Sequence, residues 1–372
     1  MLTWVEIKQS AVLHNLRQIK RLLKSQTKLM AVVKSNAYGH GMISMAQLIE
    51  KQVDYLGVVN LNEALILRQH KIHCPIFVLT FFDLEPEQIE QAIKKNIELP
   101  IYSLAQAKLL SKIARQLDKQ IKVHLKVDTG ASRIGIFPVE VVNFVKRINV
   151  LPNLKLQGIF THYAAAESMN QEYTNQQKES FRQIIIDLEK NNLCPPLQHT
   201  ACSAAILTNS QTHFNLVRLG IALYGLWPAK ETKQITERQK KKIVLKPALT
   251  WKTKIIQIKQ LPAGTFISYG LTYKTKKKTT IAVLPVGYWD GYDRRLSNCG
   301  EVLIHNQRCP IRGRVCMNLI MVDITDLNNT RVGDTVILLG KEIIIEELAN
   351  KIGTIAYEIM TRINPLLPRK YC

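Results

Sequence analysis

The chain has 372 residues, 46% of them hydrophobic and 22% charged, which predicts a folded protein of about two domains and excludes a disordered chain. Its longest apolar runs are far shorter than the roughly 18 residues that span a bilayer, so we expect no membrane span. The net charge of +22 is compatible with a nucleic-acid binder, but the densest basic runs, Lys240–Lys242 and Lys276–Lys278, lack interleaved aromatic residues, which favours a generic basic surface without a nucleic-acid partner.

The first two-thirds of the chain repeats one pattern, a short β-branched run followed by a turn and a stretch with helical spacing. Ser10 and Ser103 are expected N-caps, because apolar residues follow each of them at helical intervals. Eight such units fit an N-terminal (β/α)8 TIM barrel over residues 1–228. A doubly wound sheet would carry a glycine-rich fingerprint after its first strand, and none is present. The expected strands are 30–33, 55–59, 76–79, 98–101, 123–127, 156–160, 197–199 and 214–218.

The pattern changes after residue 228. Residues 229–247 are polar and mostly basic, which predicts a linker or a surface excursion. Residues 248–372 contain alternating strands separated by glycine-containing turns, which predicts a C-terminal all-β domain. The expected strands of that domain are 249–256, 280–284, 301–304 and 334–339. The fold class is therefore predicted to be α/β, a TIM barrel followed by an all-β domain.

Active sites of such barrels lie at the carboxyl ends of the strands, so the residue after the first expected strand is of interest. Lys34 stands there, directly behind Ala31-Val32-Val33. One interpretation is a lysine whose stem is buried and whose ammonium reaches the rim. The other is a lysine that forms a Schiff base, with its pKa lowered in a partly buried pocket lined by cations.

Other polar residues follow later strands. Lys126 and Asp128 share one face of the fifth strand, so a charge pair inside the barrel is the simplest interpretation. Arg133 lies in a glycine-bounded loop and is suited to binding a carboxylate or a phenolate through two hydrogen bonds. His162 and His199 follow the sixth and seventh strands, where a single histidine is more often structural.

The loops after the seventh and eighth strands of a barrel frequently bind phosphate through backbone N–H groups. Ser203 and Gly220-Ile221 occupy these loops, and Arg218 lies on the eighth strand. A lysine opposite a phosphate site is the arrangement that holds pyridoxal 5'-phosphate as an imine. No H-E-x-x-H, Walker A or EF-hand sequence is present, and we expect no metal.

The segment Ala31–Gly41 resembles the pyridoxal-phosphate signature of the alanine racemase family. This resemblance implies a fold-type III enzyme that interconverts L-alanine and D-alanine with two bases and supplies D-alanine for peptidoglycan. It also implies a head-to-tail homodimer in which the β domain of each partner completes the other's active site. Six further segments resemble family motifs, in the family's order: His124–Gly130, Thr161–Ala164, Val217–Gly225, Ile267–Gly270, Pro285–Tyr292 and Gly313–Asn318.

The resemblance implies roles for single residues. Lys34 would be the imine lysine and the base for the D-isomer, and Tyr269 of the second chain the opposite base. Arg218 would be the partner of the pyridine nitrogen, itself held by His162. The remaining implied positions are the phosphate contacts Tyr38, Ser203, Gly220, Ile221 and Tyr357, the substrate-carboxylate residues Arg133 and Met317, the channel gate Tyr288, and Lys126, which is carbamylated in some members.

Two residues depart from the family pattern. Cys202 stands where some members have Asn, which changes a side chain near the cofactor, and Asn318 stands where some have Asp, which alters the carboxylate pocket or the hydrogen bonds around the gate. Arg218 follows the pattern. An arginine donates a hydrogen bond to the ring nitrogen without giving up its proton, which favours racemisation over transamination or decarboxylation.

Alternatives to alanine racemisation are a racemase of broader specificity, for example for serine, and a fold-type III decarboxylase. The decarboxylase would use a carboxylate in place of Arg218. A non-catalytic pyridoxal-phosphate protein of the single-barrel type would lack both the β domain and Tyr269, which this chain has. Seven scattered cysteines without a C-x-x-C pair argue against a disulfide framework or a zinc ribbon and favour a cytoplasmic location.

Overall fold

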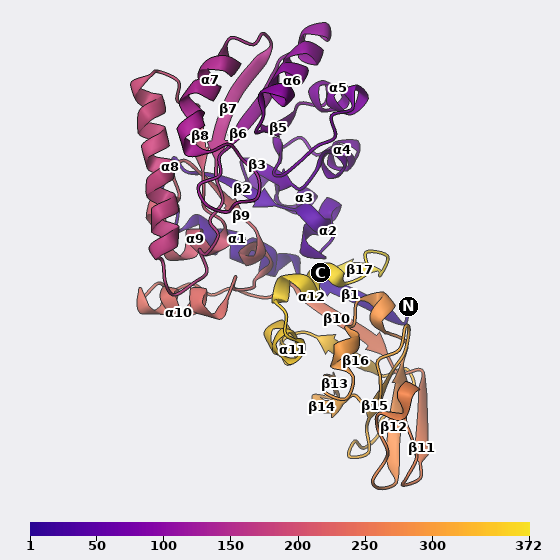
Figure 1. Ribbon diagram of the computed structural model, residues 1–372. Coiled ribbons are helices and arrows are strands. Elements are labelled where there is room, and N and C mark those ends of the chain that lie inside the picture. Colours follow the sequence, from indigo (N-terminus) through magenta and orange to yellow (C-terminus); the bar gives the residue numbers. More distant parts are fainter. The chain divides into compact units, whose positions relative to one another are not determined.

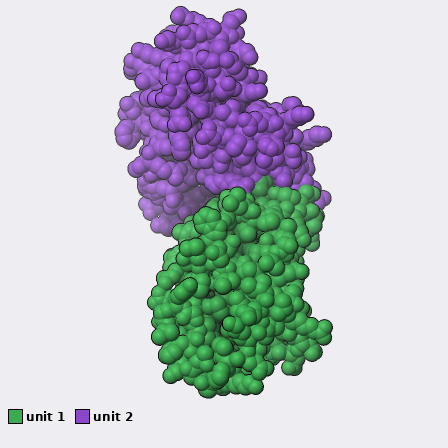
Figure 2. All heavy atoms as spheres, turned by 90° about the vertical axis from the view of Figure 1, so that its right-hand side faces the viewer, with its two compact units in different colours: residues 1–12, 38–41, 246–372 green, residues 13–37, 42–245 purple.

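A computed structural model describes residues 1–372 (Figure 1). The chain forms two compact units, coloured separately in Figure 2. The barrel unit comprises residues 13–37 and 42–245, and the β-rich unit comprises residues 1–12, 38–41 and 246–372. Neither unit is continuous in sequence. No helix is both long enough and apolar enough to span a membrane.

The barrel unit is built on eight parallel strands in the order β8-β7-β6-β5-β4-β3-β2-β9. The end strands β8 and β9 are joined by a hydrogen bond from the Arg218 amide to the carbonyl of Ala201, 2.9 Å. The predicted α/β barrel is therefore confirmed, and each expected strand overlaps an observed one. The strands are β2 Lys28–Val32, β3 Tyr55–Val58, β4 Ile76–Val78, β5 Ile97–Ile101, β6 Ile121–Lys126, β7 Leu154–Phe160, β8 Leu197–His199 and β9 Leu216–Leu219.

Helices between these strands cover the outside of the barrel, with α1 before the first strand and α10 after the last (Figure 1). Ser103 caps α6 as expected, since its side chain accepts a hydrogen bond from the amide of Gln106, 3.2 Å. The expectation for Ser10 is wrong, because α1 begins at Gln9 and the carbonyl of Lys8 accepts from the first turn. The helices are α1 Gln9–Lys20, α3 Met42–Ile49, α4 Leu61–Gln69, α5 Pro86–Lys94, α6 Leu104–Gln116, α7 Val141–Asn149, α8 Glu172–Lys190, α9 Ser203–Thr208 and α10 Lys230–Arg238.

The inside of the barrel is filled with side chains. Its apolar part is a cluster in which the Phe77 and Phe160 rings meet edge to face, with centroids 5.3 Å apart. Burial of this cluster makes the interior a low-dielectric environment for the polar side chains next to it. The cluster consists of Met30, Tyr55, Phe77, Phe160, Leu197 and Leu216.

The segment 229–247, expected to be a linker or a surface excursion, contains helix α10. Thr232 and Thr236 are buried on one side of it. Side chains just beyond the helix donate to carbonyls at the end of α9, Gln239 to Thr208 and Lys241 to Leu207, each at 2.8 Å. The segment is therefore packed on the barrel unit, because its few inward-facing residues find partners there.

The β-rich unit contains a six-stranded sheet, ordered β14-β13-β16-β10-β1-β17, and a three-stranded sheet, ordered β11-β12-β15. The N-terminal strand β1 lies in the larger sheet, antiparallel to β10 and parallel to β17, although residues 1–228 were expected to form the barrel. The strands are β1 Thr3–Ile7, β10 Leu249–Lys254, β11 Gln257–Leu261, β12 Thr279–Leu284, β13 Glu301–Ile304, β14 Gln307–Pro310, β15 Ile320–Asp323, β16 Thr335–Leu339 and β17 Arg369–Tyr371.

This unit also contains two helices, α11 (Ile345–Ile352) and α12 (Ala356–Arg362), which the expectation of an all-β domain did not include. Helix α11 buries Ile345, Leu348 and Ile352 along one face and ends at Gly353 in the left-handed conformation. The unit is thus β-rich with a helical cover.

Candidate active site

Lys34 follows β2 at the carboxyl end of the barrel strands, and the chain then makes an unusual turn. Ser35, Asn36, Ala37 and Tyr38 have φ angles of 54°, 54°, 52° and 52°, so α2 (Lys34–Tyr38) is left-handed rather than right-handed. This conformation costs roughly 1–2 kcal/mol per residue with a side chain. Such strain persists where the surroundings impose it, and it is typical of functional sites.

Side chains from neighbouring elements hold this turn. Glu63 accepts from the amides of Ser35 at 2.7 Å and Val59 at 2.9 Å, and Asn36 accepts from the amide of Met42 at 2.9 Å. Glu63 is itself fixed at the start of α4, because its amide donates to the Asn60 side chain. Glu63 was not predicted as a site residue, because the pattern Asn60-x-x-Glu63 indicates only the start of a helix.

The Lys34 amine is half-buried, and burial lowers its pKa below the usual value for lysine. The positive charge of Arg133 lowers the pKa further, whereas the carboxylate of Glu63 raises it. Burial and Arg133 prevail, so a larger share of Lys34 is uncharged at neutral pH. A neutral amine is the nucleophilic form, and this is the property expected of a lysine that reacts with a carbonyl.

Arg218 on β9 is 5% exposed, and its two terminal nitrogens make five hydrogen-bond contacts, with one N–H of Nη2 shared between two acceptors. Its Nη1 contacts the carbonyl of His199 at 2.8 Å and the Nδ1 of that ring at 2.9 Å. Its Nη2 contacts the carbonyls of Thr161 at 2.8 Å and Thr200 at 2.9 Å, and the Nδ1 of His162 at 3.3 Å. These bonds use both terminal nitrogens, so Nε is the guanidinium nitrogen left to face a ligand. Burial lowers the pKa of Arg218 to about 10, and the side chain stays charged at neutral pH.

His162 and Lys126 lie in the field of this guanidinium. Burial lowers the pKa of His162 well below its usual value, as do the charges of Arg218 and Lys126, so the ring is neutral. The pKa of Lys126 is also held well below normal, first by burial and then by Arg218 and Arg133. Its Nζ lies 4.3 Å from the centroid of the Phe160 ring.

Lys126 and Asp128 do not form the ion pair that their shared strand face suggested. The Asp128 carboxylate instead accepts from the amides of Gly130 at 2.9 Å and Ser132 at 3.0 Å. The backbone amides lower the pKa of Asp128 more than burial raises it. Lys126 therefore has cations near its amine and no carboxylate bound to it.

The expected phosphate contacts on the barrel unit lie close together. The Ser203 hydroxyl, at the start of α9, accepts from the amides of Gly220 at 2.9 Å and Ala222 at 3.4 Å. Ile221, between these two residues, is buried. Cys202, the departure from the family pattern, directly precedes Ser203, and burial raises the pKa of its thiol, which favours the neutral form.

The other two expected phosphate contacts belong to the β-rich unit. The rings of Tyr38 and Tyr357 have centroids 6.1 Å apart. The short segment that carries Tyr38 is held within this unit, because Arg369 donates to the carbonyl of Gly39 at 2.8 Å and Tyr371 to that of His40 at 3.2 Å. Gly39 has no room for a side chain there, since a Cβ would lie 2.3 Å from the carbonyl oxygen of Met360.

Tyr269, Tyr288 and Met317 are gathered on one set of loops in the β-rich unit. The Ser268 hydroxyl, next to Tyr269, donates to the carbonyl of Arg314 at 2.8 Å, and the amide of Tyr288 donates to the carbonyl of Cys316 at 3.0 Å. All three side chains are open to solvent: Tyr269 is 74%, Met317 55% and Tyr288 43% exposed. Asn318 is exposed beside them.

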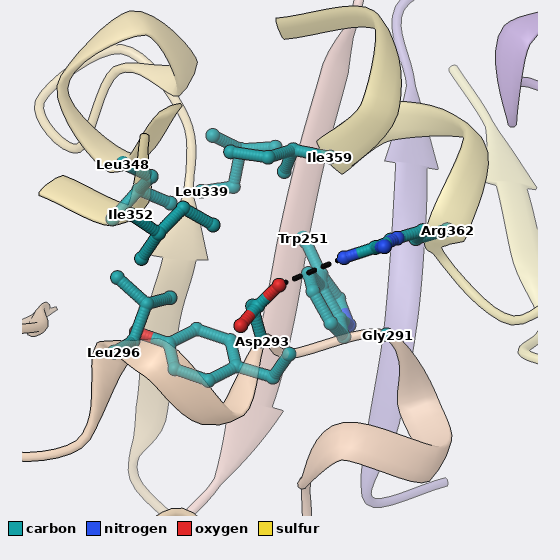
Figure 3. A pocket seen from close by; sticks show the side chains of 10 residues that line it. Trp251, Gly291, Asp293, Leu296, Leu339, Leu348, Ile352, Ile359 and Arg362 are labelled. Carbon is teal, nitrogen blue, oxygen red and sulfur yellow. Dashed lines mark hydrogen bonds and ion pairs between the residues drawn. The ribbon is translucent and has the colours of Figure 1, made fainter. Parts of the chain in front are cut away.

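A separate cavity in the β-rich unit contains none of these residues (Figure 3). Aliphatic side chains, among them Leu339 and Ile352, surround it, and an ion pair between Asp293 and Arg362, 2.8 Å, lies at one side. Its lining is mostly apolar and its only charged pair is satisfied, so it is a packing defect of this unit.

Comparisons with known proteins concern the sequence and the fold. The sequence matches the family described as "Alanine racemase, N-terminal domain" over residues 7–228 and "Alanine racemase, C-terminal domain" over residues 248–371. A relative from Methanococcus maripaludis, named alanine racemase, is 42% identical over 99% of this chain and 98% of its own length.

Two solved structures have the same fold. The alanine racemase of Clostridium difficile 630 superposes with a TM-score of 0.94 and 38% identity, covering 100% of this chain and 96% of that one. The alanine racemase of Bacillus anthracis with bound L-Ala-P superposes with a TM-score of 0.91 and 36% identity, covering 100% of this chain and 95% of that one.

Proposed function

Because this chain belongs to the alanine racemase family, we propose that it interconverts L-alanine and D-alanine with pyridoxal 5'-phosphate held in its barrel. The observation that carries this proposal is Lys34, a half-buried amine of lowered pKa, in one unit with the buried guanidinium of Arg218. A reactive amine and a donor-only cation are what this cofactor requires at its aldehyde and at its ring nitrogen.

The donor set fits the cofactor. Lys34 would hold the aldehyde carbon, and Arg218 Nε would donate to the ring nitrogen. The Ser203 hydroxyl and the amides of Gly220 and Ile221 would hold the phosphate, together with the Tyr38 and Tyr357 hydroxyls. When bound, the cofactor supplies a carbonyl that links to the amine of alanine and an electron sink that acidifies the Cα–H bond.

Arg218 determines which reaction follows. Its five hydrogen bonds fix the guanidinium in place, and a pKa of about 10 keeps it protonated at neutral pH. A proton retained by Arg218 is not transferred to the ring nitrogen. A neutral ring withdraws electrons less strongly than a protonated one, which limits side reactions and favours return of the proton to Cα.

Racemisation needs a proton acceptor on each face of Cα. We assign Lys34 to the face of D-alanine and Tyr269 of a second copy of this chain to the face of L-alanine. Tyr269 is 74% exposed and lies among further exposed apolar side chains, Leu271 at 62%, Trp289 at 62% and Met317 at 55%. Such a patch is typical of a surface that another chain covers, which supports a homodimer with shared sites.

The substrate carboxylate would bind between Arg133 of the barrel unit and Met317 of the second copy. Arg133 is exposed on its loop, so its guanidinium can meet an anion by two hydrogen bonds. Tyr288, on the loop that carries Met317, would border the channel. Serine is the alternative substrate to be compared with alanine.

Lys126 would become a carbamate. Its neutral amine can attack the carbon of CO2, forming an N–C bond and releasing one proton, and the product is an anion close to Arg218 and Arg133. The modification would replace a lysine amine by an anion that the charges of Arg218 and Arg133 favour. Binding of 13C-bicarbonate, seen as a carbamate signal in NMR, should disappear in Lys126→Ala; a signal that persists would contradict this assignment.

The reaction supplies D-alanine, for which peptidoglycan is the expected use. All seven cysteines are free thiols, which supports a cytoplasmic location. We assign the cofactor-binding residues of the barrel to residues 1–228, although β1 lies in the sheet of the other unit. Residues 229–247 form an excursion on the barrel surface. Residues 248–372 would complete the site of the second copy.

The decisive experiment combines an assay with a chemical label. Racemisation should be measured from both isomers of alanine and of serine, with pyridoxal phosphate present. Borohydride reduction followed by peptide mapping should then place the cofactor on Lys34. Absence of racemisation with every small amino acid would reject the function, and a label on another lysine would reject the site.

A further inference from the structure

A line of four buried polar side chains crosses the inside of the barrel. It runs from Arg218 on β9 through His199 on β8 and His124 on β6 to Glu98 on β5. Figure 1 labels these four strands. The links are Arg218 Nη1 to His199 Nδ1 at 2.9 Å, His199 Nε2 to His124 Nδ1 at 2.9 Å, and His124 Nε2 to Glu98 Oε2 at 2.8 Å. None of the four is more than 5% exposed.

The two ends of this chain determine the direction of every hydrogen bond in it. Arg218 can only donate, so the Nδ1 of His199 must accept and its Nε2 must carry the proton. That N–H donates to His124 Nδ1, and the proton of His124 is therefore on its Nε2. This last N–H points at Glu98, whose ionised carboxylate can only accept.

A doubly protonated histidine does not fit between these ends. A second proton on His124 would sit on Nδ1 and meet the N–H of His199, donor against donor. Burial and the charge of Arg218 hold the pKa of His199 well below its usual value, in agreement with a neutral ring. The chain therefore contains one cation, two neutral imidazoles of fixed tautomer and one anion.

The surroundings fix the rings as well. Phe160 is stacked on His199 with centroids 4.8 Å apart, and the centroid of Phe77 lies 4.2 Å from that of His124. Gly158 on β7 leaves space for His124, since a Cβ at this position would lie 2.3 Å from its Nδ1. An apolar interior strengthens aligned hydrogen bonds, and each bond in such a chain polarises the next.

Glu98 is the negative end of this chain. Its other oxygen accepts from the Tyr55 hydroxyl at 3.4 Å and lies 3.7 Å from the half-exposed ammonium of Lys122. Arg218 has no ion pair of its own, and all its acceptors are carbonyls and neutral rings. The hydrogen-bond chain thus connects the buried cation to a buried carboxylate through two aligned rings.

We propose that Glu98 is a positioning residue of the reaction: through His124 and His199 it fixes the orientation of Arg218 and keeps the guanidinium protonated against the cofactor ring. The effect on the reaction rests on the proposed function, whereas the direction of the hydrogen bonds from Arg218 to Glu98 does not. On this proposal, removing the charge of Glu98 should weaken the support that the two aligned rings give to the cation. A pKa of Arg218 lowered by about one unit would raise its neutral fraction about tenfold at a given pH.

The test begins with the apoprotein, by NMR of 15N-labelled histidine. Signals are assigned with His124→Asn and His199→Asn. In the wild-type chain both rings should be neutral and protonated on Nε2 between pH 6 and 8. A proton on Nδ1 of either ring, or a charged ring, would overturn the proposal without any need for a variant of Glu98.

The second step uses Glu98→Gln, which keeps the size of the side chain, and Glu90→Gln as the matched control. Glu90 is a partly exposed carboxylate on α5, paired with Lys94 at 2.8 Å and hydrogen-bonded to none of the four residues Arg218, His199, His124 and Glu98. An amide can donate as well as accept, so Glu98→Gln should allow the reversed tautomer of His124, and new histidine signals should appear. Unchanged histidine signals would overturn the proposal; Glu90→Gln should leave them as in the wild type.

The third step loads the same proteins with pyridoxal phosphate and compares racemisation with transamination. Glu98→Gln should slow racemisation and raise the share of transamination, by up to about the tenfold given above. Altered histidines together with this altered ratio support the proposal. Altered histidines with an unchanged ratio would overturn the proposed role of Glu98 in the reaction and would leave the direction of the hydrogen bonds established. Absence of racemisation in the wild-type protein would instead reject the proposed function.

Discussion

The amine of Lys34 lies in a field of two opposed charges. Burial lowers its pKa most, the charge of Arg133 lowers it further, and the charge of Glu63 raises it. A single substitution can therefore shift the pKa of Lys34 in either direction, because both neighbours act on the same amine. The chemistry expected of Lys34 begins from the neutral amine, so both neighbours should alter its rate at a given pH.

We predict opposite shifts for two variants. Arg133→Met removes a charge that lowers the pKa of Lys34, so this pKa should rise and cofactor attachment should need a higher pH. Glu63→Gln removes a charge that raises it, so attachment should extend to a lower pH. The rate of pyridoxal-phosphate attachment to the apoprotein, followed by absorbance across pH 6–10, measures both; shifts of the same sign would contradict the assignment of Arg133 and Glu63.

We also predict a separation of the two faces of Cα. Tyr269→Phe should abolish racemisation and leave binding of both isomers intact, because only a proton acceptor is lost. Exchange of the Cα proton with deuterated water should survive on D-alanine, where Lys34 acts, and be lost on L-alanine. Tyr273→Phe is the control, a partly buried tyrosine near Arg312 in the same unit. Equal exchange of both isomers by Tyr269→Phe would reject two separate acceptors.

At the scale of an element, the left-handed turn after β2 is the costly feature. Ser35 has φ 54° and ψ 52°, a conformation that only glycine adopts without steric penalty. The bonds from the Ser35 amide to Glu63 and from the Met42 amide to Asn36 retain it. The turn determines where the chain leaves Lys34, and its strain is offset by the packing of the barrel unit.

We expect Ser35→Gly to stabilise the protein by up to about 1 kcal/mol, because it removes the steric penalty at an exposed position. The control is Lys108→Gly in the right-handed helix α6, where glycine should destabilise by about 1 kcal/mol. Urea unfolding of the apoprotein compares the two. A loss of stability in Ser35→Gly equal to that in Lys108→Gly would show that the turn is not strained in solution.

At the scale of the whole molecule, the expected site residues are divided between two units. Lys34, Arg133 and Arg218 belong to the barrel unit, and Tyr269 and Met317 to the β-rich unit. If the β-rich unit of one chain completes the site of another, a symmetric dimer contains two equivalent sites, each with residues from both chains.

This arrangement predicts complementation. Lys34→Ala chains and Tyr269→Phe chains should each be inactive alone. Refolded together in equal amounts they should recover about a quarter of the wild-type activity, because about half of the dimers are mixed and each mixed dimer has one intact site. The activity of the mixture against its two homodimers is the measurement. No recovery, with mixed dimers present by mass spectrometry, would place Tyr269 in the site of its own chain.

Much of the fold follows from local patterns. The eight barrel strands are short runs whose residues are mostly buried, and the spacing of the helices between them repeats. The cap at Ser103 depends on residues three apart and was correctly predicted. Lys34, Ser203 and Arg218 were found because strand ends and the loops after them can be located from such patterns.

Other features depend on partners far away in sequence and were decided only by the tertiary structure. The strand Thr3–Ile7 lies in the β-rich sheet because its backbone groups pair with β10, nearly 250 residues later, and with β17. Helix α10 packs against the end of α9, and Asp128 binds backbone amides rather than Lys126. In each case the alternative was locally plausible, and the available hydrogen-bond partners decided between them.

The sequence by itself singled out the residues that we propose to carry the chemistry: the lysine after the first barrel strand, the arginine on the eighth, and the tyrosine and methionine of the C-terminal motifs. Only the tertiary structure decided their electrostatic state. The pKa of Lys34 depends on Arg133 and Glu63, and the orientation of Arg218 on His199. Burial and charge act through space, so no local pattern of residues contains them.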